Sequence, residues 1–325
     1  MGMKSIFITR QIPENGIKIL KEKGYDVTVG KYKTPPTQPE LIEELKKKNY
    51  DVVVPLLTDK IDSAVFDAVP TVKIFANYSV GFDNIDLEEA TKRNIAVTNT
   101  PGDYVDGVAE HAVALLLAIM ARLAEADQFV RAGKYQGWDP MLFMGDKLNG
   151  KTVAVIGTGR IGERFARKLS SGFGVKIIYY DVVRNERIEK ECGAQFVSSV
   201  NEALALADAV SIHVPLLPTT HHLINKNNLA KMKPTAYLIN TSRGPVVDEE
   251  ALVKALQNGR IRGAGLDVFE FEPKLTKGLV KLSNTVLSPH IASSQLESRE
   301  EMAEIVANNI IDFFEGRVPR NKVNK

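Results

Sequence analysis

Short runs rich in β-branched residues alternate with polar helical stretches from the start of this chain. The first five runs are Ile6–Thr9, Val27–Val29, Val52–Val54, Lys73–Ala76 and Ala96–Thr98. The helical stretches between them include Glu14–Lys23, Glu40–Lys47 and Leu87–Arg93. Because strands that alternate with helices pair in parallel, this pattern predicts an α/β unit with a parallel sheet covered by helices.

A second series of alternating strands and helices follows after an interruption of this pattern. A long helical pattern, Val105–Arg131, and a Gly/Trp/Pro stretch up to Gly150 are expected to connect two units. The seven further strands are expected at Thr152–Ile156, Lys176–Tyr180, Gln195–Val197, Ala209–Val214, Ala236–Ile239, Ala264–Val268 and Thr285–Leu287. This is the number of strands in a six-stranded dinucleotide-binding fold plus one. The amphipathic stretch Leu296–Phe314 is compatible with packing on either unit.

Composition excludes several classes of protein. The net charge is +2 and lacks a basic stripe, so no nucleic-acid partner is expected. The longest apolar run, Ala112–Ala121, has ten residues and is expected to be a buried helix, since a membrane span needs roughly 20. The single cysteine, Cys192, and the lack of a Cys/His cluster with metal-ligand spacing predict a reducing cytoplasm and no metal.

A glycine turn stands between the first strand of the second series and its helix. Gly157, Gly159 and Gly162 flank Arg160 and Ile161 in the pattern G-x-G-x-x-G. In this context the first glycine makes a tight turn, the second lets a pyrophosphate approach, and the third lets the helix pack on the strand. The sequence therefore predicts dinucleotide binding here.

The next strand ends in an acidic residue, Asp181, which stands 24 positions after Gly157. A carboxylate at this position accepts hydrogen bonds from the adenosine ribose hydroxyls and repels the 2′-phosphate of NADP. Arg184 and Arg187 follow and could hold such a phosphate, but are interpreted as solvated charges. We therefore expect NAD(H) rather than NADP(H).

Three candidates for carbonyl chemistry follow predicted strand ends, where ligands bind in open α/β sheets. The planar guanidinium of Arg243 suits an α-keto carboxylate. His290 suits a general acid in reduction and a base in oxidation. An acidic residue could orient the imidazole, and spacing alone leaves both Glu270 and Glu272 open.

The other four histidines have structural interpretations. His111 is expected to be packed in a core helix, and His221 and His222 to lie on a surface loop. His213 ends a strand and could line the cofactor site without reacting.

Several further motifs occur in order along nearly the whole chain. They are Ala76–Asp86, Val108–His111, the glycine turn, Leu238–Gly244, Leu266–Glu270 and Ser288–Ala292. With them the chain resembles the D-isomer-specific 2-hydroxyacid dehydrogenases, most closely the glyoxylate/hydroxypyruvate reductase branch. The resemblance implies two doubly wound parallel-sheet domains. A Rossmann NAD-binding domain, residues 102–290, would be inserted into a flavodoxin-like substrate domain of residues 1–101 and 291–325, with the active site in the cleft.

The resemblance also implies roles for individual residues. The catalytic residues would be Arg243, Glu272 and His290, which selects Glu272 over Glu270. Cofactor contacts would include Asp267 and the backbone near Thr241, which would hold the nicotinamide carboxamide. Substrate contacts would come from Val80, Gly81 and an apolar wall at Leu56 or Leu57. Trp138 would reach the active site of a partner subunit in a homodimer or serve as an interface anchor.

The function implied is reduction of a small 2-keto acid, glyoxylate or hydroxypyruvate, to the D-2-hydroxy acid with NADH. D-Lactate and D-3-phosphoglycerate dehydrogenases are the alternative enzymes. An alternative of another class is an NAD-sensing corepressor-like protein that binds the cofactor without turnover.

Overall fold

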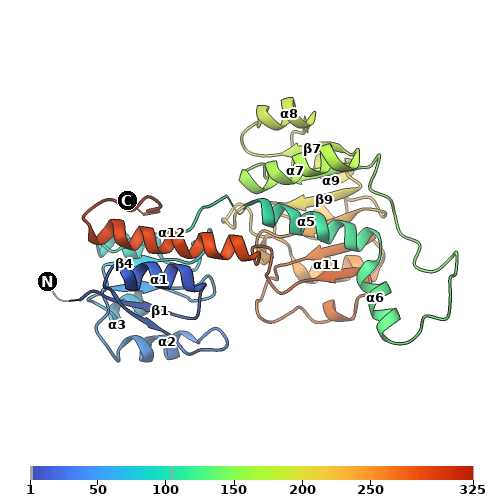
Figure 1. Ribbon diagram of the computed structural model, residues 1–325. Helices are drawn as coiled ribbons and strands as arrows, with labels where there is room; N and C mark the ends of the chain where they lie inside the picture. The colour runs from blue at the N-terminus through green and yellow to red at the C-terminus, as the bar shows by residue number, and fades with distance from the viewer. Residues whose placement is uncertain (1–2, 104, 325) are drawn as a thin grey trace. The chain divides into compact units, whose positions relative to one another are not determined.

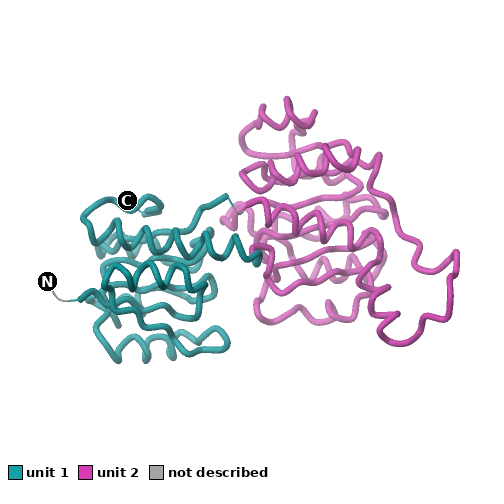
Figure 2. The backbone as a smooth tube through the Cα atoms, in the orientation of Figure 1, with its two compact units in different colours: residues 1–104, 294–325 teal, residues 105–293 magenta. Residues whose placement is uncertain are grey.

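The chain folds into two compact units in a computed structural model that describes residues 3–103 and 105–324. The first unit comprises residues 1–104 and 294–325, and the second comprises residues 105–293 (Figure 2). Each boundary lies three residues beyond the one expected. Both units are mixed α/β with a parallel sheet, the fold class expected from the alternation.

The first unit contains a five-stranded parallel sheet in the order β2-β1-β3-β4-β5. The strands are β1 Ser5–Ile8, β2 Asp26–Val29, β3 Val52–Val54, β4 Ile74–Ala76 and β5 Ala96–Thr98. The helices are α1 Glu14–Glu22, α2 Gln38–Leu45, α3 Ser63–Ala68, α4 Leu87–Lys92 and α12 Leu296–Phe314. All five strands lie where the sequence predicts them.

Alternating side chains of this sheet face two apolar layers. Ile6 and Ile8 of β1 pack in the core on the side of α1 and α12, whereas Phe7 packs on the side of α2 and α3. This is the two-residue period of a strand that is buried on both faces. The helix α12 lies alongside α1 (Figure 1), so the amphipathic stretch near the carboxyl terminus belongs to the first unit.

The second unit contains a seven-stranded parallel sheet in the order β12-β11-β10-β9-β6-β7-β8. Its strands are β6 Thr152–Ile156, β7 Lys176–Tyr180, β8 Gln195–Phe196, β9 Ala209–Ile212, β10 Tyr237–Asn240, β11 Gly263–Leu266 and β12 Thr285–Leu287. The order reverses between β6 and β9, which is the position where doubly wound sheets bind ligands at their carboxyl edge.

Helices cover both faces of this sheet (Figure 1). Val153 and Val155 pack in the layer of α5 and α7, whereas Ala154 and Ile156 pack in the layer of the helices α9 to α11. The helices are α5 Val105–Met120, α6 Leu123–Arg131, α7 Arg160–Phe173, α8 Glu186–Cys192, α9 Val200–Leu206, α10 Lys226–Leu229 and α11 Glu249–Gln257. Two short 3-10 helices, η1 Gly244–Val246 and η2 Leu279–Lys281, complete the unit. Cys192, the last residue of α8, packs against the α5–α7 layer.

The expected continuous helix from Val105 to Arg131 is wrong. Arg122 has φ of 54° and separates α5 from α6, which are bent by 65° relative to each other. A residue in the left-handed conformation ends a right-handed helix. The guanidinium of Arg122 is held by Glu125, with contacts of 2.9 and 2.8 Å, and lies over the ring of Phe143.

No single helix in the described part of the chain is long and apolar enough to cross a membrane. The bent pair α5 and α6 meets the length and composition requirements together, but most of α5 is buried inside the second unit.

Candidate active site

The glycine turn follows β6 and opens α7, as predicted. Gly157 has φ of 90° and donates its N–H to the carbonyl oxygen of Tyr180 at 2.9 Å. A Cβ atom on Gly162 would lie 2.0 Å from the Gly157 carbonyl oxygen, so helix and turn are in close contact. A Cβ atom on Gly159 would meet nothing within 4 Å. The amino end of α7 therefore faces open space, which fits the pyrophosphate of a dinucleotide.

Asp181 follows β7 and faces the glycine turn. Its Oδ2 accepts hydrogen bonds from the backbone N–H of Thr158 at 2.6 Å and from its hydroxyl at 3.0 Å. Its Oδ1 accepts from the N–H of Val182 at 2.7 Å. A carboxylate has about four acceptor sites, so Asp181 retains capacity for a ribose hydroxyl.

The two arginines after Asp181 are held by carboxylates. Arg184 donates to Glu189 at 2.8 Å, and Arg187 lies 3.3 Å from both Glu191 and Glu163. Both arginines are exposed and paired with glutamates, as expected for charged residues on a solvated surface.

The three candidate catalytic residues follow the carboxyl ends of three adjacent parallel strands. Arg243 follows β10, Glu272 follows β11 and His290 follows β12, and these strands are neighbours in the sheet. Parallel pairing brings the three segments to one edge of the second unit. This edge also carries the glycine turn after β6.

The structure distinguishes the two glutamates that spacing left open. His290 Nδ1 lies 2.9 Å from Glu272 Oε2, and Glu272 Oε1 accepts from the N–H of Phe269 at 2.9 Å. Glu270 instead contacts His222. His290 has φ of 54°, and its N–H donates to the Asp267 carbonyl oxygen at 2.8 Å. With Glu272 at Nδ1, the Nε2 atom of His290 is left to exchange a proton.

Arg243 lies in a turn whose backbone is held by the end of β10. Asn240 donates to the carbonyl oxygen of Arg243 at 3.0 Å and accepts from the N–H of Ser242 at 3.0 Å. A Cβ atom on Gly244 would lie 1.9 Å from the backbone of Phe269, so this turn packs directly on the segment that leads to Glu272. The sequence therefore needs glycine after Arg243.

Asp267 is fully buried beneath the His290 segment. Its carboxylate accepts from the Ser288 hydroxyl at 2.6 Å and from the N–H groups of Ile291 and Ala292 at 2.9 and 2.8 Å. His111 Nε2 lies 2.9 Å from the Ser288 hydroxyl and 3.3 Å from Asp267 Oδ1. The expectation of a merely packed His111 is therefore incomplete, because its ring belongs to this polar network.

Burial raises the pKa of Asp267, but the hydrogen bonds from His111, Ser288, Ile291 and Ala292 outweigh it, so the pKa lies below its ordinary value. The carboxylate is thus the charged anchor of the segment that carries His290. The nearby Thr241 hydroxyl is buried and has no hydrogen-bond partner among the described residues. A buried hydroxyl without a partner at this edge has the capacity to form a hydrogen bond with a ligand.

The remaining histidines differ in their surroundings. His213 lies 2.8 Å from the Ser211 hydroxyl and packs on the ring of Phe165. Burial lowers its pKa to about 3, so the ring is neutral. His221 is exposed as expected, but His222 is half-buried and lies 2.6 Å from Glu270. Sequence spacing misses the set His221, His222 and Glu270, which only the fold brings together.

The loop after β4 in the first unit presents two backbone N–H groups without partners among the described residues, those of Val80 and Gly81. The carbonyl oxygens of these two residues accept from the side chains of Asn99 and Asn77 at 2.8 and 2.9 Å. With the carbonyl groups occupied, the N–H groups can bind an anion. Leu56, after β3, pairs with Tyr78 at the start of this loop.

An irregular arm of residues 132–150 joins α6 to β6 on the outside of the second unit (Figure 1). Trp138 on this arm is 84% exposed, and Met141 and Met144 are also exposed. The structure therefore places the tryptophan on the surface of its own unit.

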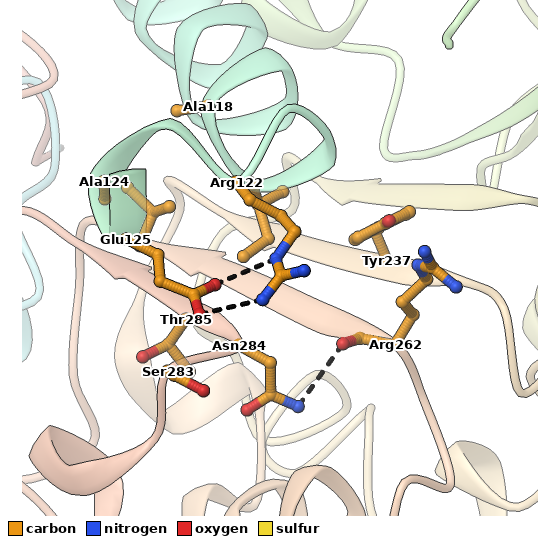
Figure 3. Close-up of a pocket in the computed structure, with 11 residues that line it drawn as sticks. Ala118, Arg122, Ala124, Glu125, Tyr237, Arg262, Ser283, Asn284 and Thr285 are labelled. Atoms are coloured by element: carbon orange, nitrogen blue, oxygen red, sulfur yellow. Dashed lines mark hydrogen bonds and ion pairs between the residues drawn. The ribbon is translucent and has the colours of Figure 1, made fainter. Parts of the chain in front are cut away.

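A cavity of about 240 Å³ lies at the opposite edge of the second sheet (Figure 3). Tyr237 and Thr285, which line it, begin β10 and β12. Its two arginines face carboxylates: Arg122 binds Glu125, and Arg262 lies 2.9 Å from Asp146. The described residues that line this cavity include none of the predicted site residues.

Comparison with known proteins identifies the relatives of this chain. The family model "D-isomer specific 2-hydroxyacid dehydrogenase, NAD binding domain" matches residues 113–292. A glyoxylate reductase from Thermococcus litoralis is 51% identical over 98% of this chain and 96% of its own length.

Two solved structures are similar over the whole chain. A protein from Thermus thermophilus is 38% identical, with a TM-score of 0.91 over 98% of this chain and 99% of that one. An NADPH-dependent glyoxylate/hydroxypyruvate reductase from Sinorhizobium meliloti, in complex with NADP and malonate, is 32% identical. Its TM-score is 0.86 over 99% of this chain and 97% of that one.

Proposed function

The chain belongs to the D-isomer specific 2-hydroxyacid dehydrogenase family. On this basis we propose that it uses NADH to reduce glyoxylate to its achiral 2-hydroxy acid or hydroxypyruvate to the D-2-hydroxy acid. The observation that carries the proposal is the contact of 2.9 Å between His290 Nδ1 and Glu272 Oε2. These two residues follow β12 and β11, and Arg243 follows the neighbouring strand β10. The curated relatives named glyoxylate reductase support the substrate class.

Each of the three residues has a distinct task in this reaction. A nicotinamide cofactor held at the glycine turn and Thr241 would supply the hydride for the C2 carbon of the keto acid. Arg243 binds the substrate carboxylate and the carbonyl oxygen with its planar guanidinium. His290 donates the Nε2 proton to that oxygen, which becomes the hydroxyl group. Glu272 accepts from Nδ1, holds the ring in this orientation and balances its charge in the protonated form.

The first unit contributes the proposed carboxylate site. We propose that the N–H groups of Val80 and Gly81, which have no partner among the described residues, bind the carboxylate, with Leu56 as an apolar surface beside them. A substrate as small as glyoxylate presents little more than a carboxylate and an aldehyde, and one pair of backbone N–H groups suits a carboxylate.

The proposed preference for NADH depends on Asp181. Its carboxylate repels a 2′-phosphate, and Arg184 and Arg187 are occupied by glutamates. The related Sinorhizobium meliloti reductase is NADPH-dependent and its structure is in complex with NADP, so membership of the family does not by itself select the cofactor. Gly157, Gly159, Arg160, Ile161, Gly162, Thr241 and Asp267 are the other proposed cofactor residues.

The proposed assembly is a homodimer in which the arm around Trp138 binds the partner. Exposed apolar side chains on α6 and the arm support this: Leu123 is 61% exposed, Val130 56% and Tyr135 58%. Clusters of this kind mark protein interfaces. Trp138 is proposed to reach the partner's substrate, so Trp138→Ala should raise KM in a protein that light scattering still finds dimeric.

The test is oxidation of NADH and NADPH, measured separately with glyoxylate, hydroxypyruvate, pyruvate and phosphohydroxypyruvate. We expect the highest kcat/KM with NADH and one of the first two acids. Arg243→Ala should lower kcat/KM by orders of magnitude, while Arg320→Ala, an exposed arginine bound to Asp312, should leave it unchanged. Near-wild-type turnover in Arg243→Ala would refute the mechanism. Saturable NADH binding without turnover on any acid would favour the corepressor-like alternative.

A further inference from the structure

Three side chains with metal-binding atoms meet in the second unit apart from the proposed catalytic residues. His221 and His222 lie in the segment after β9, and Glu270 follows β11. Their potential ligand atoms all lie within 4.8 Å of one another. We propose that His221, His222 and Glu270 bind one divalent transition-metal ion of the zinc class.

The backbone at His222 brings the two imidazoles to the same side of the chain. Consecutive side chains in an extended segment point in opposite directions. Here His222 has φ of 50°, and the two rings stack with centroids 4.1 Å apart. The N–H of His222 donates to the Pro245 carbonyl oxygen at 2.9 Å, and the N–H of Ile224 donates to that of Val246 at 3.0 Å. These bonds hold an uncommon conformation for a non-glycine residue.

Glu270 is oriented toward the histidines by the backbone of α11. Its Oε2 accepts from the N–H of Glu249 at 3.0 Å, which leaves Oε1 facing His222 Nε2 at 2.6 Å. The side chain of Glu270 is 9% exposed and that of His222 is 35% exposed. A carboxylate fixed by a second hydrogen bond is a well-oriented metal ligand.

The chemistry of the three donors selects the class of ion. Two imidazole nitrogens and one carboxylate oxygen suit Zn²⁺, Ni²⁺ or Cu²⁺, whereas Mg²⁺ and Ca²⁺ prefer oxygen alone. Three protein ligands leave the fourth tetrahedral position to water, which the exposure of His221 permits.

An ion in this site would replace the contact between His222 Nε2 and Glu270 Oε1. Tetrahedral coordination with bonds of about 2.0 Å places two donor atoms about 3.3 Å apart, so the pair opens from 2.6 Å. The buried Glu249 also contacts Glu270. Its carboxylate accepts from the N–H groups of Glu270 and Thr276.

The test is titration of the full-length, tag-free protein with ZnCl₂ after treatment with a chelator. Isothermal titration calorimetry gives the stoichiometry and the affinity. We expect one ion per chain and at least a tenfold weaker affinity in both His221→Ala and His222→Gln. Since His221 is exposed, His221→Ala keeps the His222 contact with Glu270 and should not disturb folding. The absorption of bound Co²⁺ reports tetrahedral coordination independently.

Two matched variants locate the ion. Cys192→Ser removes the only thiol, and His290→Asn removes the other histidine in contact with a glutamate. Both should bind Zn²⁺ as the wild type does. Loss of binding in either one, unchanged binding in His221→Ala, or no binding by the wild type would overturn the proposal. These measurements use no substrate, so they are independent of the proposed reductase activity.

Discussion

Replacement of Asp267 by asparagine tests the buried network beneath His290. The wild-type carboxylate accepts from Ser288 and Ile291 through Oδ1 and from Ala292 through Oδ2. Asparagine has one acceptor oxygen, so its amide group would face at least one of these donors. A buried donor left without an acceptor costs about 1–3 kcal/mol, and the remaining hydrogen bonds are weaker because their acceptor is no longer charged. We expect Asp267→Asn to lower the free energy of unfolding by about 2–4 kcal/mol at pH 7.

The pH dependence follows from the lowered pKa of Asp267. A group whose pKa is lower in the folded state stabilises the protein above its unfolded pKa, which is about 3.9 for aspartate. That stabilisation is lost as the pH falls through the folded pKa. The difference between wild type and variant should therefore be constant from about pH 5 to 8 and become smaller below about pH 4.

Urea unfolding followed by far-ultraviolet circular dichroism is the appropriate assay, because Trp138 is 84% exposed and its fluorescence does not report on the core. The two units can unfold separately, and only the transition of the second unit should move. Asp248→Asn is the matched control: Asp248 caps α11 through the N–H of Ala251, and asparagine caps a helix equally well. A loss below about 1 kcal/mol at pH 7, or a deficit unchanged in acid, would refute the reasoning.

Further substitutions probe the turn, the proton donor and the cofactor preference. Gly244→Ala places a Cβ 1.9 Å from the backbone of Phe269 and should destabilise the protein by about 3 kcal/mol or more, measured by thermal unfolding. Gly159→Ala meets nothing within 4 Å, so it should unfold as the wild type does and bind NADH more weakly by fluorescence titration. His290→Asn should lower kcat about 10²–10⁴-fold with unchanged circular dichroism, and a smaller loss would exclude it as the proton donor. Asp181→Ala should lower the ratio of kcat/KM for NADH over NADPH at least about tenfold, and an unchanged ratio would contradict the proposed role.

Local sequence patterns were sufficient for the strands of the fold. Each strand of the first unit has a β-branched run, and the glycine turn stands between β6 and α7 where the pattern places it. These features depend on neighbours within a few residues, because strand and helix periods and glycine turns are local properties. The order of motifs along the chain also identified the family.

The break at Arg122 was not visible in the sequence. Apolar and helix-forming residues continue on both sides of it, so periodicity predicts one helix. The left-handed turn depends on Glu125 and Phe143, which hold the arginine side chain after the chain has bent.

The choice between Glu270 and Glu272 shows most clearly what the tertiary structure decides. The two residues are separated by one position, yet one contacts His222 and the other contacts His290. The network of Asp267, Ser288 and His111 likewise joins segments from β11, β12 and α5. Sequence alone determined which residues carry suitable chemistry and that they follow strand ends. Their partners depend on which strands are neighbours in the sheet, and that order arises from packing between segments far apart in the chain.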